Sequence, residues 1–308
     1  MTPAARRIAF GAVAAVAATV GVAIGSGDDD APPPPEPPAA RRTPAPRPMP
    51  PEPSAARRVP AQRPTPARAG APLAEDVGRL VILRFTGPSL PPYVRRALRE
   101  HRSAGVVLFA DNVRDPAQLR TLTGAIARAS DGRALVLADQ EGGAVRMVPW
   151  AGPEDSATGQ AAAGTVRSAS RAAGRELRAT GVSVALAPVA DVPAAGSALA
   201  GRAFASDAGG VASAVGEAVA GFRAGGVAPT VKHFPGLGAA PVNTDDGPVD
   251  IAEAPTLAPF EAAVEAGVPL VMVSHARYLT LDARRIASQS PAVVNGLLRD
   301  ASGFAAWH

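Results

Sequence analysis

The chain has 308 residues, with 31 Lys and Arg, 27 Asp and Glu, and no cysteine. The lack of cysteine excludes disulfide bonds, thiolate metal sites and a cysteine nucleophile. Residues 1–72 carry a net charge of +4, from nine arginines and five acidic residues, whereas residues 73–308 carry 22 charges of each sign. A neutral main part lacks the basic stripe that follows a phosphate backbone, so we expect no nucleic-acid partner.

The first 30 residues have an order of charges that is typical of an export segment. Arg6 and Arg7 precede an uncharged apolar run at residues 8–25, and three aspartates follow at residues 28–30. This order predicts a signal peptide or a signal anchor over residues 1–30. We therefore expect the protein to lie outside the cytoplasm, either secreted or held at the membrane by this segment.

Residues 31–72 predict a linker. They hold 16 of the chain's 33 prolines, mixed mainly with alanine and arginine. Such a composition cannot build an apolar core, and it favours an extended, disordered chain. We interpret the segment as a spacer between the export segment and a folded domain at residues 73–308.

From residue 73 onward, short apolar runs alternate with longer stretches of helical period. Strands are predicted at residues 79–85, 104–110, 134–138, 182–188, 227–231 and 268–273. Helices are predicted at residues 92–101, 117–129, 160–180, 208–224, 257–266 and 291–299. Apolar strands separated by helices indicate a parallel α/β sheet that is buried on both faces. An open doubly wound sheet and a closed (β/α)8 barrel both fit this alternation.

Polar side chains follow four successive predicted strands, within three residues of each strand end. They are Asp139, Asp191, the pair Lys232 and His233, and His275. Lys232 is also the only lysine of the chain. In a β/α barrel the carboxyl ends of the strands converge on one mouth, where enzymes of this fold place their active sites. We therefore expect these side chains to share one site.

Two motifs give the chain a resemblance to a known family. Residues 139–143 read Asp-Gln-Glu-Gly-Gly, and residues 232–238 read Lys-His-Phe-Pro-Gly-Leu-Gly. Weaker matches lie at residues 105–109, 187–192, 201–204, 290–291 and 297–299. With these motifs the chain resembles the N-terminal barrel of family 3 glycoside hydrolases, in the bacterial β-N-acetylhexosaminidase branch. The resemblance implies a TIM-type (β/α)8 barrel that removes terminal β-linked N-acetylglucosamine from cell-wall glycans, without a cofactor or a metal.

The resemblance also implies a set of substrate-binding residues. They are Asp139, Arg146, Arg202, Lys232, His233 and His275. Arg146 belongs to the set because its neighbour Met147 occupies the position of a family arginine. A carboxylate accepts hydrogen bonds from adjacent sugar hydroxyls, and Lys and Arg donate charge-assisted bonds to their oxygens. These residue types therefore suit a carbohydrate ligand.

The catalytic positions depart from the family pattern. The family nucleophile is an aspartate shortly after a Gly-Phe-Asp-Gly stretch, whereas this sequence reads Gly-Phe at residues 303–304 and ends at His308. We expect a C-terminally truncated barrel with about six of its eight strands, which alone is either poorly soluble or requires a partner. The family's Asp-x-His acid/base dyad aligns with Asn243 and Asp245. We therefore expect Asp245 or Asp246 to act as the acid/base, or the chain to be inactive.

The residues leave three alternatives to hydrolysis open. The first is a non-catalytic protein that binds amino sugars through the same side chains. The second is a barrel enzyme in which Lys232 forms a Schiff base with a carbonyl substrate. The third is a metal enzyme in which His233, His275 and Asp139 converge, although no His-x-His or His-Glu-x-x-His spacing is present.

Overall fold

The computed structural model of the protein describes residues 73–304. The predicted export segment, the predicted linker and residues 305–308 lie outside this range. Within it, no helix is long and apolar enough to cross a lipid bilayer.

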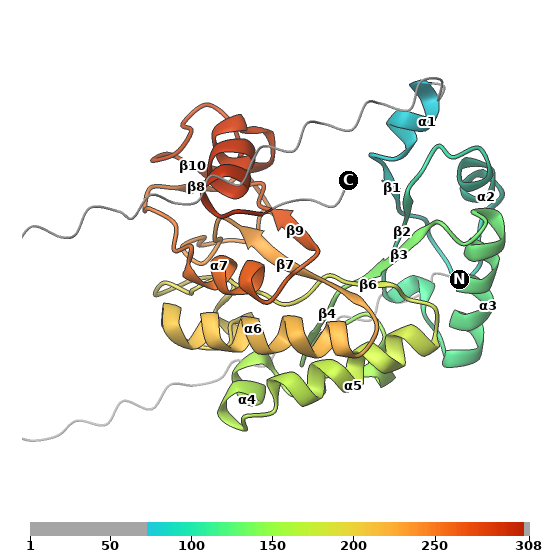
Figure 1. Cartoon of the computed structure of the whole chain (residues 1–308), viewed down its shortest axis with the longest axis horizontal. Coiled ribbons are helices and arrows are strands. Elements are labelled where there is room, and N and C mark those ends of the chain that lie inside the picture. Colours follow the sequence, from blue (N-terminus) through green and yellow to red (C-terminus); the bar gives the residue numbers. More distant parts are fainter. Residues whose placement is uncertain (1–72, 305–308) are drawn as a thin grey trace, which may run out of the picture. The chain divides into compact units, whose positions relative to one another are not determined.

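Six parallel strands form the central sheet (Figure 1). They are β1 (Ile82–Leu83), β2 (Gly105–Leu108), β3 (Leu135–Ala138), β6 (Val184–Ala185), β7 (Ala228–Phe234) and β9 (Leu270–Val273). Each of the six predicted strands overlaps one of them. Every strand pairs in parallel with the next one along the chain. The sheet therefore lacks the reversal of strand order that defines a doubly wound fold, and it is an incomplete β/α barrel, as the resemblance implies.

Helices surround this sheet on its outer side (Figure 1). A short helix, α1 (Leu73–Gly78), precedes β1, and the connecting helices are α2 (Pro92–Arg99), α3 (Pro116–Ala129), α5 (Val166–Ala179), α6 (Ala208–Ala224) and α7 (Ala258–Glu265). Two of them begin at aspartate caps. Asp115 accepts hydrogen bonds from two backbone N–H groups of α3 at 2.9 Å, and Asp207 accepts one from α6 at 2.9 Å. These carboxylates satisfy backbone donors that have no partner inside the helix.

Two predicted helices differ in the structure. The single helix expected at residues 160–180 is wrong, because the segment forms α4 (Ala157–Ala162) and α5 with a break between them. The break lies at Gly164, whose φ of 66° is left-handed and ends a right-handed helix. The helix expected at residues 291–299 is present as a wider π-helix at Ala292–Ala301.

Short elements extend the loops that follow the strands. After β3, the strands β4 (Gln140–Gly142) and β5 (Val145–Arg146) form an antiparallel hairpin. The strands β8 (Asp250–Ile251) and β10 (Arg277–Tyr278) pair in parallel. One-turn 3₁₀ helices lie at Ala110–Asn112, Pro149–Ala151, Ala200–Arg202 and Ala287–Gln289. The loops at the carboxyl ends of β3, β6 and β7 are therefore structured rather than plain connections.

The apolar core packs against β7, the strand that carries Lys232 and His233. Phe234, at the end of β7, is fully buried and packs edge-to-face on Phe260 of α7, with 5.3 Å between the ring centroids. Both rings belong to the core cluster that joins α6, β7 and α7. Such a pair contributes about 0.5–1.5 kcal/mol beyond the area it buries. Because Phe234 follows Lys232 and His233 directly, this packing holds the backbone of both in place.

A close backbone approach joins the loops after β6 and β7, and it predicts the effect of one substitution. A Cβ atom on Gly238 would lie 1.8 Å from the carbonyl oxygen of Val192. The N–H group of Ala194 also donates to the carbonyl of Gly238 at 2.9 Å. We expect Gly238→Ala to lower the free energy of unfolding by about 1–3 kcal/mol, because the two backbones must separate.

Urea denaturation of the parent protein, of Gly238→Ala and of a control variant at one pH measures this effect. Gly247→Ala is the matched control, since a Cβ there meets no atom within 4 Å. Equal stability of Gly238→Ala and Gly247→Ala would contradict the close approach of the two loops.

Candidate active site

The charged residues of the two motifs meet at the carboxyl ends of β3, β6 and β7. Asp139 directly follows β3, and Glu141 lies on β4 of the hairpin that comes next. Asp191 follows β6, whereas Lys232 and His233 belong to the last residues of β7. A sixth residue, Arg202, ends the 3₁₀ helix Ala200–Arg202 in the loop between β6 and α6. We call Asp139, Glu141, Asp191, Arg202, Lys232 and His233 the strand-end cluster.

Lys232 lies between two carboxylates. Its Nζ contacts Oδ1 of Asp139 and lies 2.6 Å from Oε1 of Glu141. The Lys232 and Glu141 side chains are only 2% and 5% exposed, whereas Asp139 is 22% exposed. An ammonium group this deep in a protein is stabilised only by paired negative charge. The partners explain why lysine is tolerated at this buried strand end.

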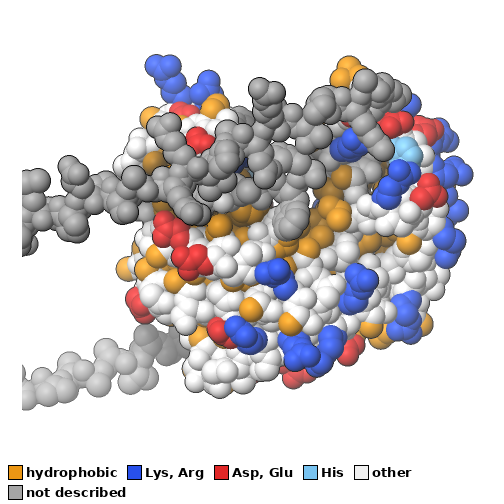
Figure 2. Space-filling view, in the orientation of Figure 1, with side chains coloured by type: hydrophobic (Ala, Val, Ile, Leu, Met, Phe, Trp, Pro, Cys, Tyr) orange, Lys and Arg blue, Asp and Glu red, His pale blue; other side chains and the backbone are white. Residues whose placement is uncertain are grey.

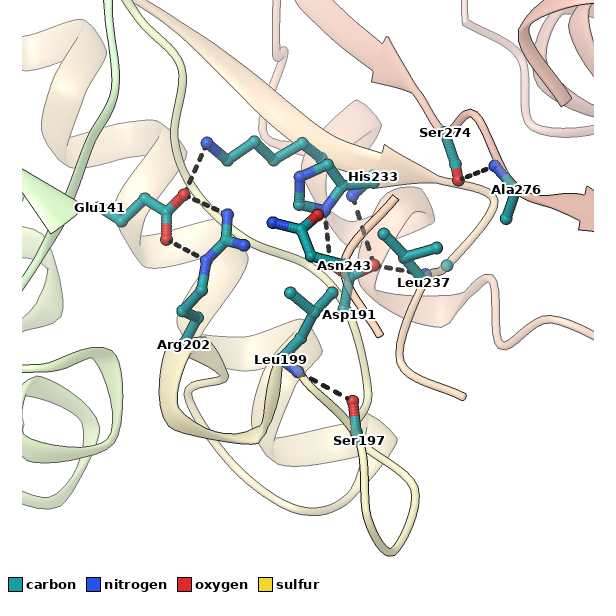
Figure 3. Close-up of polar contacts among 12 residues, drawn as sticks. Glu141, Asp191, Ser197, Leu199, Arg202, His233, Leu237, Asn243, Ser274 and Ala276 are labelled. Carbon is teal, nitrogen blue, oxygen red and sulfur yellow. Dashed lines mark hydrogen bonds and ion pairs between the residues drawn. The ribbon is translucent and has the colours of Figure 1, made fainter. Parts of the chain in front are cut away.

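Arg202 binds the other side of Glu141. Its Nε donates to Oε2 at 2.8 Å and its Nη2 donates to Oε1 at 2.6 Å, so the contact is bidentate (Figure 3). Burial raises the pKa of Glu141, but the hydrogen bonds from Arg202 and the charge of Lys232 outweigh it, and the pKa lies below its ordinary value. Burial lowers the pKa of Arg202, and its bonds to Glu141 reverse this and raise it. Glu141 is therefore the shared carboxylate of two cations.

The lowered pKa of Glu141 predicts a pH dependence of stability. A carboxyl group whose pKa is lower in the folded state stabilises the fold above its unfolded pKa, here about 4.5. That contribution is lost as the pH falls below 4.5 through the folded value. We expect the melting temperature to fall in this acidic window, and to fall less in Glu141→Gln, as measured by circular dichroism. An equal acid dependence in both proteins would contradict the ion pairs of Glu141.

Asp191 holds the imidazole of His233 and the turn that follows it. Its Oδ2 lies 2.7 Å from Nδ1 of His233, and its Oδ1 accepts from the backbone N–H groups of Leu237 at 2.6 Å and His233 at 3.3 Å (Figure 3). Asp191 is 1% exposed and His233 is 15% exposed. Because a carboxylate only accepts hydrogen bonds, Nδ1 carries the proton and Nε2 is available to a ligand.

The remaining predicted site residues lie outside the contacts of this cluster. His275 is exposed, and its Nδ1 lies 2.8 Å from Oγ of Ser288. Arg146 donates to the carbonyls of Gly143 at 2.8 Å and Pro149 at 3.2 Å, within its own hairpin and the turn after it. Their substrate-binding roles stay predictions.

The two predicted acid/base residues lie on an exposed loop between β7 and β8. Asp245 and Asp246 are both exposed. The nearest polar partner of both is Asn243, whose Nδ2 lies 3.5 Å from Oδ2 of Asp245 and whose carbonyl accepts from the N–H of Asp246 at 3.0 Å. In residues 73–304 no hydrogen bond or ion pair connects these carboxylates to the strand-end cluster. Their catalytic role also stays a prediction.

Sequence reasoning missed one member of the strand-end cluster. Glu141 lies inside the first motif, but it was assigned no role in the site. The signal for Glu141 is its place two residues after Asp139, which puts two acidic residues at one strand end opposite the only lysine. Asp191 was expected among the strand-end side chains of the site, and in the structure it lies there against His233.

The geometry weighs against two of the alternative chemistries. Among residues 73–304, no three His, Cys, Asp or Glu side chains are grouped as a metal site requires. His275 in particular bonds to Ser288 rather than to the residues around His233. A Schiff base at Lys232 would require its Nζ to leave two carboxylates in a position that is 2% exposed. The arrangement suits the binding of a polar ligand better than either reaction.

Comparisons with known proteins identify the family of the chain. Residues 73–306 match the family model described as the glycosyl hydrolase family 3 N terminal domain. A β-hexosaminidase from Xanthomonas euvesicatoria pv. vesicatoria is 32% identical over 241 residues, which cover 73% of this chain and 72% of that protein.

Two solved structures show the same fold. A family 3 β-N-acetylglucosaminidase from Paenibacillus sp. str. FPU-7 has a TM-score of 0.71 and 31% identity, over 76% of this chain and 48% of its own. The chain thus spans about half the length of that protein. A β-N-acetylhexosaminidase from Beutenbergia cavernae DSM 12333 has a TM-score of 0.67 and 32% identity, over 77% of each chain. The chain therefore belongs to glycosyl hydrolase family 3 and contains its N-terminal domain.

Proposed function

We propose that this chain is a glycoside hydrolase of the β-N-acetylhexosaminidase kind, which removes terminal β-linked N-acetylglucosamine from glycans. Its relatives named β-hexosaminidase and β-N-acetylglucosaminidase support this proposal. They share the domain that holds the strand-end cluster, so the substrate class is inferred from the site together with the family.

The observation that carries the proposal is the pairing of Lys232 and Arg202 with one carboxylate beside the partly exposed Asp139. Lys232 and Arg202 both contact Glu141, and Arg202 is 24% exposed. The cluster therefore presents fixed donors and a fixed acceptor at the edge of solvent. Each hydroxyl of a sugar ring both donates and accepts hydrogen bonds, so a site that binds adjacent hydroxyls holds donors and acceptors close together. In this proposal the sugar binds above the cluster, and His233 adds a hydrogen bond through Nε2.

Hydrolysis also requires proton transfer to the glycosidic oxygen. Glycosidases of the common type use two carboxyl groups on either side of the scissile bond, one of them an acid. We assign the acid to Asp245 or Asp246, on the loop that follows β7. No residue of the printed sequence is assigned to the second carboxyl group, because none matches the family nucleophile. A sugar bound at the strand ends would bring its leaving group toward this loop, since β7 carries both the loop and Lys232.

A second candidate is a non-catalytic protein that binds amino sugars. The exposed position of Asp245 and Asp246, away from the contacts of the strand-end cluster, favours it. In that case the cluster would retain the sugar without cleaving it. Both candidates require the same binding site and differ in turnover alone.

The cellular setting follows from the N-terminal sequence. We propose that the domain acts outside the cytoplasm on peptidoglycan-type glycans, behind a cleaved signal or a signal anchor at residues 1–30. The basic pair before the apolar run and the acidic residues after it support this. Edman sequencing of the protein recovered from cell fractions tests it, because a cleaved signal exposes a new N-terminus and an anchor leaves the protein in membranes.

The activity is tested with the full chain and p-nitrophenyl N-acetyl-β-D-glucosaminide. We expect release of p-nitrophenol, with a loss of about 100-fold or more in kcat for Asp245→Asn or Asp246→Asn. Asp300→Asn, an exposed aspartate of the last helix, is the matched control. Binding of N-acetylglucosamine by calorimetry without turnover would select the non-catalytic candidate, and the absence of both would reject the proposal.

A further inference from the structure

Charge is segregated over the outer helices of the domain. The helices α2, α3 and α5 carry nine arginines and one glutamate, whereas α6 and α7 carry one arginine and three glutamates. All nine arginines are exposed, and Figure 2 shows Lys and Arg side chains gathered along the edge that α2 forms. A general preference for arginine would enrich every helix, so it does not account for this difference.

Most of these arginines have no acidic partner in the described part of the chain. Within residues 73–304, Arg167 is the one arginine of α2, α3 and α5 that forms an ion pair, with Glu217. The other eight form what we call the basic band: Arg95, Arg96, Arg99, Arg120, Arg128, Arg171, Arg175 and Arg178. Like charges on neighbouring helices repel one another, so a surface of this kind gains free energy when it binds an anion. The expectation that the neutral net charge of residues 73–308 leaves no basic stripe is therefore wrong, because acidic residues that balance the charge lie on other elements, such as α6 and α7.

A groove runs between two helices of the basic band. It has a volume of about 490 Å³ and is lined by α3 on one side and by the end of α5 on the other. Arg120 and Arg178 are among its lining residues, one from each helix. The hydroxyl of Thr123 joins its walls by donating to the carbonyl of Thr180 at 2.9 Å. Two planar guanidinium groups on one groove match the geometry of phosphate oxygens.

The position of the groove separates it from the strand-end cluster. Its lining includes Ala134 and Val182, which stand at the amino ends of β3 and β6. The cluster lies at the carboxyl ends of the same strands. A ligand in the groove therefore leaves the candidate active site open.

We propose that the basic band binds a linear polymer of phosphate groups, which lies in the groove between α3 and α5. A flexible chain can follow a groove and reach arginines on α2, α3 and α5, whereas a flat bilayer reaches only their outermost atoms. Among the helices of the band, Tyr93 of α2 is the one aromatic residue. The surface therefore lacks the stacking platform that binds the bases of single-stranded nucleic acid.

The test uses the full chain and fluorescently labelled long-chain inorganic polyphosphate at low salt. The variant Arg120→Glu/Arg178→Glu reverses both charges of the groove. The control Arg284→Glu/Arg299→Glu makes the same change in net charge at two exposed arginines away from the band. We expect the groove variant to lose about tenfold or more in affinity and the control to stay within about twofold of the parent. Arg120→Gln/Arg178→Gln, a milder change, should show a smaller loss in the same direction.

Three outcomes would overturn the proposal. The first is no binding of polyphosphate by the parent chain. The second is an equal loss in the groove and control variants, which would indicate unspecific attraction to net charge. The third is tighter binding to phosphatidylglycerol vesicles or to an oligothymidylate of equal charge than to polyphosphate. That result would indicate that the basic band binds a membrane or a nucleic acid. Unchanged melting temperatures show that each variant is folded.

Discussion

Lys232→Met should lower the free energy of unfolding by about 3–5 kcal/mol, the cost of removing one partner of a buried ion pair. The Lys232 side chain is 2% exposed and contacts both Asp139 and Glu141. Without its ammonium group, Asp139 loses its cation and Glu141 keeps only Arg202, which already balances one charge. The cluster then carries an excess negative charge in a site of low dielectric constant. Chemical denaturation at neutral pH measures the loss.

A second variant separates the charge effect from the loss of packing. Lys232→Met/Glu141→Gln removes one charge of each sign, and we expect it to recover part of the stability lost in Lys232→Met. Arg284→Met, which removes an exposed cation, should change stability by about 0.5 kcal/mol or less. If Lys232→Met is as mild as Arg284→Met, the buried ion pairs do not exist as described.

Asp191→Ala should destabilise the domain by about 3 kcal/mol and weaken sugar binding about tenfold, since a buried charged acceptor serves three donors. The donors are Nδ1 of His233 and the backbone N–H groups of His233 and Leu237. The stability loss comes from the donors that lose their partner. The binding loss comes from the imidazole, whose orientation is no longer fixed.

A double-mutant cycle tests whether Asp191 acts on the ligand through His233. In a His233→Ala background, Asp191→Ala should have little further effect on the affinity for N-acetylglucosamine, although it should still lower stability. Calorimetry and urea denaturation give the two readouts. Additive losses of affinity would show that Asp191 does not act as a positioning residue for His233.

The order of the elements was predictable because short apolar runs, typical of strands, alternate along the chain with longer stretches in which apolar residues recur at the helical period. Each β-branched apolar run predicted a strand, and each of those strands is present in the parallel sheet. The break between α4 and α5 was not predicted, because a glycine within an Ala/Arg-rich stretch does not by itself reveal its left-handed φ. The hairpin of β4 and β5 was missed because each strand has three residues or fewer, below the length at which alternation is visible.

The site was predictable to the level of strand ends and no further. The prediction that Asp139 and Lys232 lie together is met in the structure, since parallel strands bring their carboxyl ends to one side. The pairing of Glu141 with Lys232 and Arg202 was not predictable. Glu141 lies in the β4–β5 hairpin rather than at the end of β3, and Arg202 lies in the long loop between β6 and α6. Spacing in the sequence does not determine the direction of such side chains. The positions of Asp245 and Asp246 depend on the same kind of loop geometry.

The most direct test of the central claim is a calorimetric titration of the full chain with N-acetylglucosamine, beside the variant Arg202→Met. Arg202 contacts the cluster only through Glu141 and is partly exposed, so the variant should remain folded. The account predicts one binding site per chain and a loss of affinity of about tenfold in the variant, which corresponds to one charged hydrogen bond. Absence of binding to the parent chain, or equal affinity in both proteins, would contradict a sugar site at the strand-end cluster.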